Sequence, residues 1–270
     1  MKIRKSIFAG AGLIAGLFMS TMAMAQDEDV NKWAPANIHI DGKASEWSKP
    51  LSFYNNDAKL FYTIANDSNN LYVVISAPDA QNQMKIMRAG FTFSVNATGK
   101  KKVVSSVTFP ILGEDAPEVV ESQNQRNSVE WRRSVLQNAK QISVEGLVGV
   151  PDGIMSVKND KNILSAASLD DQGNLICELA IPLSYIGITY GNDKPIAYRF
   201  KVNALNRDDR KAKEKEEKER IAALQAAEKE GKTPPAGAHN GMRNGLNGPG
   251  MENLFYPKDF WTRQILATHK

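Results

Sequence analysis

Residues 59–77 read KLFYTIANDSNNLYVVISA, and this stretch decides the fold class. Both ends are rich in the aromatic and β-branched residues that favour strands. Residues 66–70 (NDSNN) are turn formers, because Asn and Asp tolerate left-handed backbone and bond to their own main chain. The pattern therefore predicts a β-hairpin, with strands over 59–65 and 71–77.

The same alternation of short apolar runs and turn residues continues along the chain. Further strands are predicted over 91–95, 103–109, 142–150, 163–168, 175–181, 198–204 and 261–268. The turn DDQGN at 170–174 predicts a second hairpin. About ten short strands at hairpin spacing indicate an all-β protein, an antiparallel β-sandwich, and not a βαβ fold.

Two segments break this rhythm. Residues 122–140 contain few breakers and predict a helix packed on the sandwich, and residues 207–230 predict a charge-dense helix. The glycine-rich stretch that follows completes an insertion over 207–250. This insertion is either a solvated appendage or an element that docks a partner or covers a ligand.

The N-terminus has the three zones of a secretory signal. Lys2, Arg4 and Lys5 precede an apolar run over residues 7–18, which is too short to span a bilayer as a helix. Residues 23–25 (AMA) predict cleavage after Ala25. We expect a signal peptide at 1–25, a flexible leader at 26–37 and a single domain at 38–270, located in the periplasm or secreted; an uncleaved anchor is the alternative.

Composition excludes one class of partner and limits the covalent chemistry. The net charge of +4 falls to +1 when the three cationic residues of the signal are removed, so nucleic acid is not an expected partner. The only cysteine is Cys177, which rules out an intrachain disulfide. Because Cys177 lies in a predicted strand, we expect a buried, inert thiol, with a reactive thiol as the alternative.

Four short motifs occur in a fixed order. They are Ile40-Asp41-Gly42-Lys43 with Glu46-Trp47; Asp67 with residues 71–73 (LYV); Asp79; and Glu178 followed by residues 181–183 (IPL) and Gly187. In this order they resemble the family 9 carbohydrate-binding modules, whose wider relatives include the haem-binding DOMON domains. The resemblance covers residues 38–187 and implies an antiparallel β-sandwich in which Trp47 belongs to the core.

The resemblance also implies a ligand and a metal. Its sugar-binding members hold saccharides against aromatic rings, and Trp131, Tyr256 and Trp261 are the candidate contact residues here. Members often hold structural calcium, for which Asp41, Asp67 and Asp79 are the candidates; capping of turns is the alternative for these three. Sugar C–H faces pack on aromatic rings, and sugar hydroxyls need planar polar partners.

No catalytic motif stands out, since GxSxG, P-loop and HExxH patterns are absent from the sequence. We therefore expect an exported, non-catalytic carbohydrate-binding protein, linked to glycoside hydrolases by family context alone. The first alternative is a structural or protein-interaction module of the cell envelope. The second is a haem-binding module, with axial ligands drawn from Met84, Met87 or Met251 and one of the histidines at 39, 239 and 269.

Overall fold

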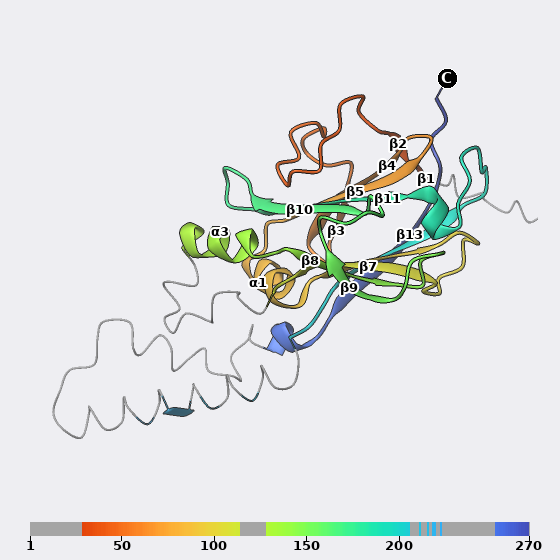
Figure 1. Ribbon diagram of the computed structural model, residues 1–270. Coiled ribbons are helices and arrows are strands. Elements are labelled where there is room, and N and C mark those ends of the chain that lie inside the picture. Colours follow the sequence, from red (N-terminus) through yellow and green to blue (C-terminus); the bar gives the residue numbers. More distant parts are fainter. Residues whose placement is uncertain are drawn as a thin grey trace, which may run out of the picture.

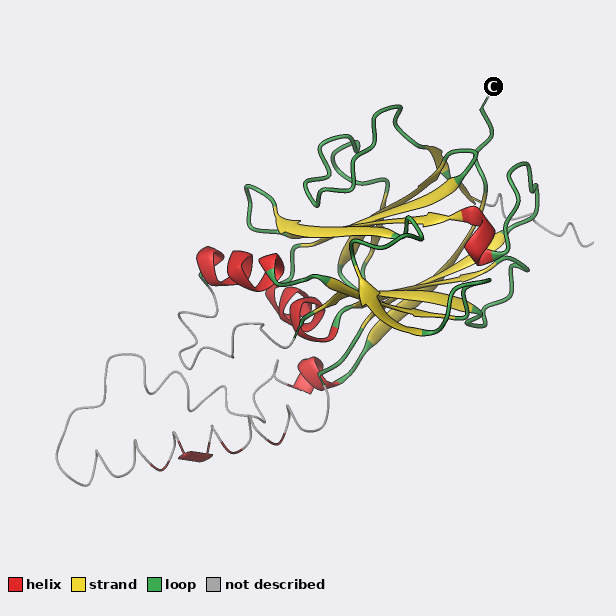
Figure 2. Cartoon of the chain, viewed as in Figure 1, coloured by secondary structure: helices red, strands yellow, loops and turns green. Residues whose placement is uncertain are grey.

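Two β-sheets pack face to face in the computed structural model (Figures 1 and 2). The structure describes residues 29–113, 128–205 and 252–269, together with Lys211, Lys215, Lys218, Glu219 and Ala222. The predicted signal peptide at 1–25 lies outside the described residues. No helix among the described residues is long and apolar enough to cross a membrane.

Each sheet is mostly antiparallel. The seven-stranded sheet has the order β1 (Asp29–Val30), β13 (Lys258–Ile265), β12 (Ile196–Val202), β6 (Phe91–Asn96), β7 (Ser105–Ile111), β8 (Gln141–Glu145) and β9 (Gly153–Ser156). The six-stranded sheet has the order β10 (Leu164–Leu169), β11 (Leu175–Pro182), β5 (Asn70–Ala77), β4 (Leu60–Asn66) and β2 (Lys32–Trp33), with β3 (Phe53–Asn55) paired to β4. The predicted sandwich is thus confirmed.

Both predicted hairpins form, and an aspartate organises each turn. In the β4–β5 turn, Asp67 Oδ1 accepts hydrogen bonds from the backbone N–H groups of Asn69 and Asn70, at 2.6 and 2.7 Å. In the β10–β11 turn, Asp170 Oδ1 accepts from the N–H of Asn174 at 2.8 Å. Such local bonds stabilise the turn in which they occur, and the turn then fixes the register of its strands.

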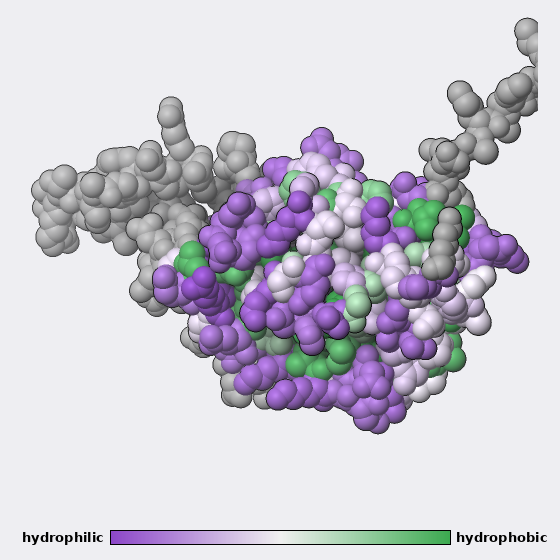
Figure 3. Space-filling view, turned by 90° about the horizontal axis from the view of Figure 1, so that it is seen from above, coloured by the Kyte–Doolittle hydropathy of each residue, from purple (hydrophilic) through white to green (hydrophobic). Residues whose placement is uncertain are grey.

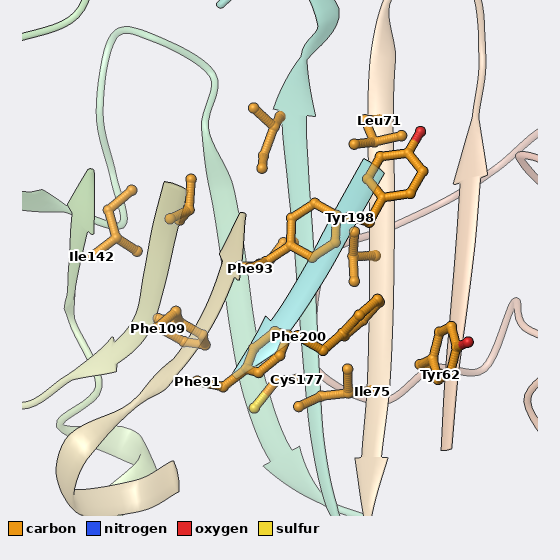
Figure 4. Packing of buried hydrophobic residues seen from close by; sticks show 14 of the residues in the cluster. Tyr62, Leu71, Ile75, Phe91, Phe93, Phe109, Ile142, Cys177, Tyr198 and Phe200 are labelled. Atoms are coloured by element: carbon orange, nitrogen blue, oxygen red, sulfur yellow. The ribbon is translucent and has the colours of Figure 1, made fainter. Parts of the chain in front are cut away.

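The main core lies between the sheets, where inward side chains of both sheets interdigitate (Figure 4). Phe93 and Tyr198 of the seven-stranded sheet stack with ring centroids 5.7 Å apart. Tyr62 of the six-stranded sheet meets Phe200 at 4.6 Å. Cys177 is buried in this core, as predicted, and burial raises the pKa of its thiol.

Residues 34–51, which we call the strap, lie over the outer face of the six-stranded sheet. There they form a second core, in which residues of the strap pack on residues of β4, β5 and β11. The strap contributes Ala34, Ala44, Trp47 and Leu51, and the strands contribute Ala65, Tyr72, Val74, Ile176 and Ala180. The six-stranded sheet is therefore covered on both faces. Figure 3 looks down on this side of the molecule, where hydrophilic side chains surround small hydrophobic patches.

The start of the described chain differs from the expected flexible leader. Residues 29–33 form β1, which pairs in parallel with β13, and β2, which pairs in parallel with β4. Asn31 lies between the two sheets and donates from Nδ2 to Asn66 Oδ1 and to the Tyr198 hydroxyl, both at 3.3 Å. The leader is thus tied to both sheets, through partners that lie far away in sequence.

The helices are placed at one end of the sandwich. The helix predicted over 122–140 is found as α3 (Val129–Gln137), capped by Ser128; residues 122–127 lie outside the described part. A second helix, α1 (Ala80–Ala89), begins after the cap Asp79 and was not predicted. In the insertion, the five described residues are helical, and the rest of 207–250 falls outside the described residues.

One predicted strand is shorter than expected. The strand predicted over 142–150 ends at Glu145, because the chain turns at Gly146 with φ +65°. β9 begins at Gly153 and forms an edge of the seven-stranded sheet, although no strand was predicted at this position.

Candidate functional site

The buried carboxylate of Glu178 fastens the strap to the sheet. Glu178 lies on β11 and is 0% exposed. Its Oε1 accepts a hydrogen bond from the indole N–H of Trp47 at 2.7 Å, and its Oε2 accepts from the N–H of Gly42 at 2.6 Å and of Asp41 at 3.2 Å. Burial raises the pKa of Glu178, while the bonds from Trp47 and Gly42 act in the opposite direction.

Glycine is required where the strap meets β10. Gly42 has φ +83°, and a Cβ built on it would lie 2.8 Å from the carbonyl carbon of Ala167. Its carbonyl accepts a hydrogen bond from Ser168 Oγ at 2.7 Å. The first and last motifs of the sequence resemblance therefore meet at one structural junction.

Beside this junction lies an open groove, which we call the strap groove. The strap covers the outer face of the sheet at the level of Glu178 but covers the next row of cross-strand neighbours only in part. That row runs through Tyr54, Phe61, Ser76, Ile176 and Ser168. The groove has a volume of about 730 Å³, with the strap on one side and the β10–β11 turn on the other.

A second opening, the end cavity, lies at the end of the sandwich where the β4–β5 turn meets η1 (Leu183–Ile186) and the loop after it. Its volume is about 850 Å³. It is lined by Ser68, Asn69, Asn70, Asn162, Pro182, Leu183, Ser184, Gly187, Ile188, Thr189 and Tyr190. None of these residues carries a formal charge at neutral pH, so the polar groups of the cavity are amides, hydroxyls and backbone groups, beside one aromatic ring and the apolar side chains of Pro182, Leu183 and Ile188.

The aromatic wall of the end cavity is held from behind. Tyr190 is 37% exposed, and its ring meets that of Trp33 edge-on at a centroid distance of 6.0 Å. The Tyr190 hydroxyl accepts a hydrogen bond from the backbone N–H of His269 at 3.1 Å. Trp33 and His269 come from opposite ends of the described chain, so the tertiary structure fixes the position of Tyr190.

The amides of the end cavity are carried by tight turns. Asn69 is placed by the turn that Asp67 organises, and Asn162 adopts φ +55° in the loop before β10. Both are exposed, and neither side chain makes a hydrogen bond within the described part of the chain. On the facing wall, Gly187 ends η1 in the left-handed conformation. Free amides on fixed turns are available to bind a ligand.

The three aromatic residues predicted to contact a ligand line neither opening. Trp131 lies on α3 and packs partly buried against the main core. Tyr256 follows η2 (Glu252–Phe255) and is 65% exposed. Trp261 lies on β13, where the Arg199 guanidinium stands 5.9 Å from its ring. The structure does not bring the three rings into one site.

The three predicted calcium ligands also lie apart, and each has a local partner. Asp41 pairs with Lys43 at 2.9 Å, and this bond lowers the pKa of Asp41. Asp67 caps its turn and accepts a hydrogen bond from the Tyr72 hydroxyl. Asp79 caps α1. Within the described ranges, no three His, Cys, Asp or Glu side chains are grouped as a metal site would require.

Sequence reasoning missed Asn162 and Tyr190, although it quoted their neighbours. The turn at 66–70, the residues Pro182 and Leu183, and Gly187 were recognised as fold motifs, and the structure places residues of all three in the wall of the end cavity. Tyr190, in the loop ITYG, carried no signal of its own. Tyr190 is held in the cavity wall by its contact with the ring of Trp33, which is distant in sequence.

The architecture defines this chain as a two-sheet β-sandwich protein with two short helices. No family model matches the chain, and a search among curated proteins found no matching relative.

Proposed function

We propose that this chain is an exported, non-catalytic protein that binds a neutral carbohydrate in the end cavity. The observation that carries the proposal is the lining of that cavity, which combines free amides and hydroxyls with Tyr190 and contains no charged side chain.

The chemistry of this lining matches that of a sugar. An amide offers a donor and an acceptor side by side, which suits neighbouring sugar hydroxyls, and Asn69 and Asn162 both present such a group. The exposed ring of Tyr190 can pack against the C–H face of a pyranose. Because no lining residue is charged, a neutral ligand that fills the cavity would not bury a charged side chain without a partner.

The resemblance to family 9 carbohydrate-binding modules supports the same reading. Its motif residues Trp47, Gly42 and Glu178 contact one another in the strap junction, as a fold signature should. The signal pattern at 1–25 supports export to the periplasm or the medium, where polysaccharides are found. No observation on the described residues favours the haem alternative, since Met87 is buried in the core and His39 is exposed.

A glycan array probed with the mature protein, residues 26–270, tests the proposal. Ligands that are retained are then titrated calorimetrically against Asn162→Ala and Tyr190→Ala. Each variant removes an exposed contact and should weaken binding about tenfold, since the loss of one good contact costs ~1.4 kcal/mol. Trp261→Ala is the matched control, because Trp261 does not line the cavity.

Three outcomes would contradict the proposal. One is a folded protein that retains no glycan. Another is equal binding by wild type and both cavity variants, which would place the sugar elsewhere. Release of reducing ends from a bound polysaccharide would show an enzyme instead of a binding protein.

A further inference from the structure

The strap groove differs in chemistry from the end cavity. Its floor is apolar, formed by Phe61 and Ile176, and the exposed ring of Tyr54 lies beside Phe61 at a centroid distance of 4.5 Å. Tyr54 is 48% exposed, so this aromatic pair faces solvent. Ser76 and Ser168 lie in the same row of the sheet, and the Ser168 hydroxyl already donates its proton to the Gly42 carbonyl. Such a surface favours an apolar ligand that also carries hydrogen-bonding groups.

Two charged residues that line the groove are unpaired. Lys49 and Asp171 are both exposed, and neither forms an ion pair or side-chain hydrogen bond with another described residue. The other charged residues of the lining are engaged: Lys43 pairs with Asp41, and Asp170 binds the N–H groups of its own turn. The groove therefore presents one free positive and one free negative charge.

These two charges lie toward opposite ends of the groove. Lys49 precedes Ser52, whose N–H bonds to Thr63 of β4 at 2.9 Å, so Lys49 is near the β3–β4 end. Asp171 is in the turn that joins β10 to β11 at the other end. Across the sheet, two to three strand spacings of ~4.8 Å separate these ends, so the two charges are at least about 10–14 Å apart, and an offset along the strands adds to this separation.

We infer that the strap groove binds a short apolar peptide with free termini. An extended chain rises ~3.3 Å per residue, so a peptide of at least three or four residues is needed to span the distance between the two charges. The terminal carboxylate would lie at Lys49 and the terminal ammonium at Asp171, with apolar side chains on Phe61 and Ile176. A ligand with a single charge would leave the opposite charge of the groove without a partner. This inference is independent of sugar binding in the end cavity.

Calorimetric titration of the mature protein with trileucine tests the inference. Trileucine should bind, and N-acetyl-trileucine amide, which lacks both terminal charges, should bind about tenfold more weakly, since two exposed ion pairs contribute up to ~1 kcal/mol each. Dileucine is too short to reach both charges and should also bind more weakly than trileucine.

Two variants assign the direction of the peptide. Asp171→Asn should weaken trileucine binding about two- to fivefold, as expected for one exposed pair, but should not affect the N-acetylated peptide with a free carboxylate. Lys49→Met should weaken trileucine binding by a similar factor, but should not affect a peptide that has a free ammonium and an amidated carboxylate. Asp193→Asn and Lys100→Met are the matched controls, because they make the same charge changes outside the groove.

The inference is overturned if trileucine does not bind to the folded protein, if the blocked peptide binds as well as the free one, or if the groove variants behave like their controls. Tyr190→Ala separates this site from the sugar site, since it should leave trileucine binding unchanged. Loss of the sugar with retention of the peptide would support two separate sites.

Discussion

At the residue scale, Glu178 gathers three donors from the strap on two carboxylate oxygens. An ionised carboxylate has acceptors only, and this suits a site where every neighbour donates. The price in desolvation is visible in the raised pKa of Glu178. The side chain therefore acts as a structural anchor, since the strap encloses it completely.

Glu178→Gln tests this role, because an amide has one oxygen and one NH₂ group. Whichever way the amide is turned, its NH₂ group must face the N–H of Trp47 or the N–H of Gly42. Two hydrogen-bond donors then face each other in a buried site. We expect the free energy of unfolding to fall by about 2–4 kcal/mol. Urea denaturation measures the change, with the exposed Glu145→Gln as control; a loss equal to that of the control would show that Glu178 does not anchor the strap.

Sequence reasoning at this scale was right where the cause is local. The turns at Asp67 and Asp170 and the burial of Cys177 can be predicted from neighbouring residues. In the structure both aspartates accept hydrogen bonds within their turns, and Cys177 is buried. Asn31 and Tyr190 were missed, because their roles depend on Asn66, Tyr198, Trp33 and His269, which the sequence does not place nearby.

At the element scale, α1 explains why a helix can escape prediction. Its sequence AQNQMKIMRA buries Asn82, Gln83 and Lys85 as well as Ile86 and Met87, so its buried face is mixed and shows no continuous apolar stripe. The buried amides are satisfied by distant carbonyls: Asn82 donates to Ala58 at 2.6 Å and Gln83 to Gly173 at 3.0 Å. The strands, by contrast, show their alternation directly in sequence.

Lys85 joins α1 to the chain after the insertion and gives a pH-dependent prediction. Its Nζ donates to the carbonyl of Tyr256 at 2.6 Å, and burial lowers its pKa to about 8. The unfolded chain, with a lysine pKa of ~10.4, holds this proton more tightly. The cost of the buried charge is therefore fully present below pH 8 and disappears as the pH rises toward ~10.4.

Lys85→Met carries no such charge, so its stability relative to wild type should be greatest at pH 7 and should decrease at pH 10. Urea denaturation of both proteins at the two values measures this difference. The exposed Lys100→Met is the control and should show no such trend. A constant difference between wild type and Lys85→Met would contradict the burial of a charged amine at this position.

At the scale of the whole molecule, the described residues on either side of the insertion meet at one place. The N–H of Leu205 donates to the carbonyl of Leu254 at 3.0 Å, so the chain leaves and re-enters the sandwich at neighbouring positions. Among the described residues, both cores are built from residues between Ala34 and Val202 together with Leu266. We therefore expect the sandwich to form without the segment 207–250.

Replacing residues 207–250 by a short Gly-Ser linker should leave a folded sandwich. We expect the free energy of unfolding to change by about 1 kcal/mol or less, because closure entropy varies slowly with loop length. Circular dichroism and urea denaturation measure the result, and sugar binding in the end cavity should persist. Unfolding of the shortened protein would show that the segment is part of the architecture.

The fold class was predictable from sequence and the sites were not, for a physical reason. Alternation and turn residues are properties of neighbouring positions, and they determine strands and hairpins. Both openings arise where separate segments meet: the strap with the β10–β11 turn, and the β4–β5 turn with η1. The positions of the tryptophans in the sequence do not indicate either opening, because tryptophan lines neither of them.

The pairing of β1 with β13 has a consequence for the order of events during synthesis. The residues that emerge first at 29–30 can find their partners at 264–265 only after almost the whole chain has been made. β2 can pair with β4 much earlier, but β1 has no sheet edge to join until β13 has been made, and contacts of such wide sequence separation form slowly. The seven-stranded sheet therefore gains its last two strands only when synthesis of the chain is nearly complete.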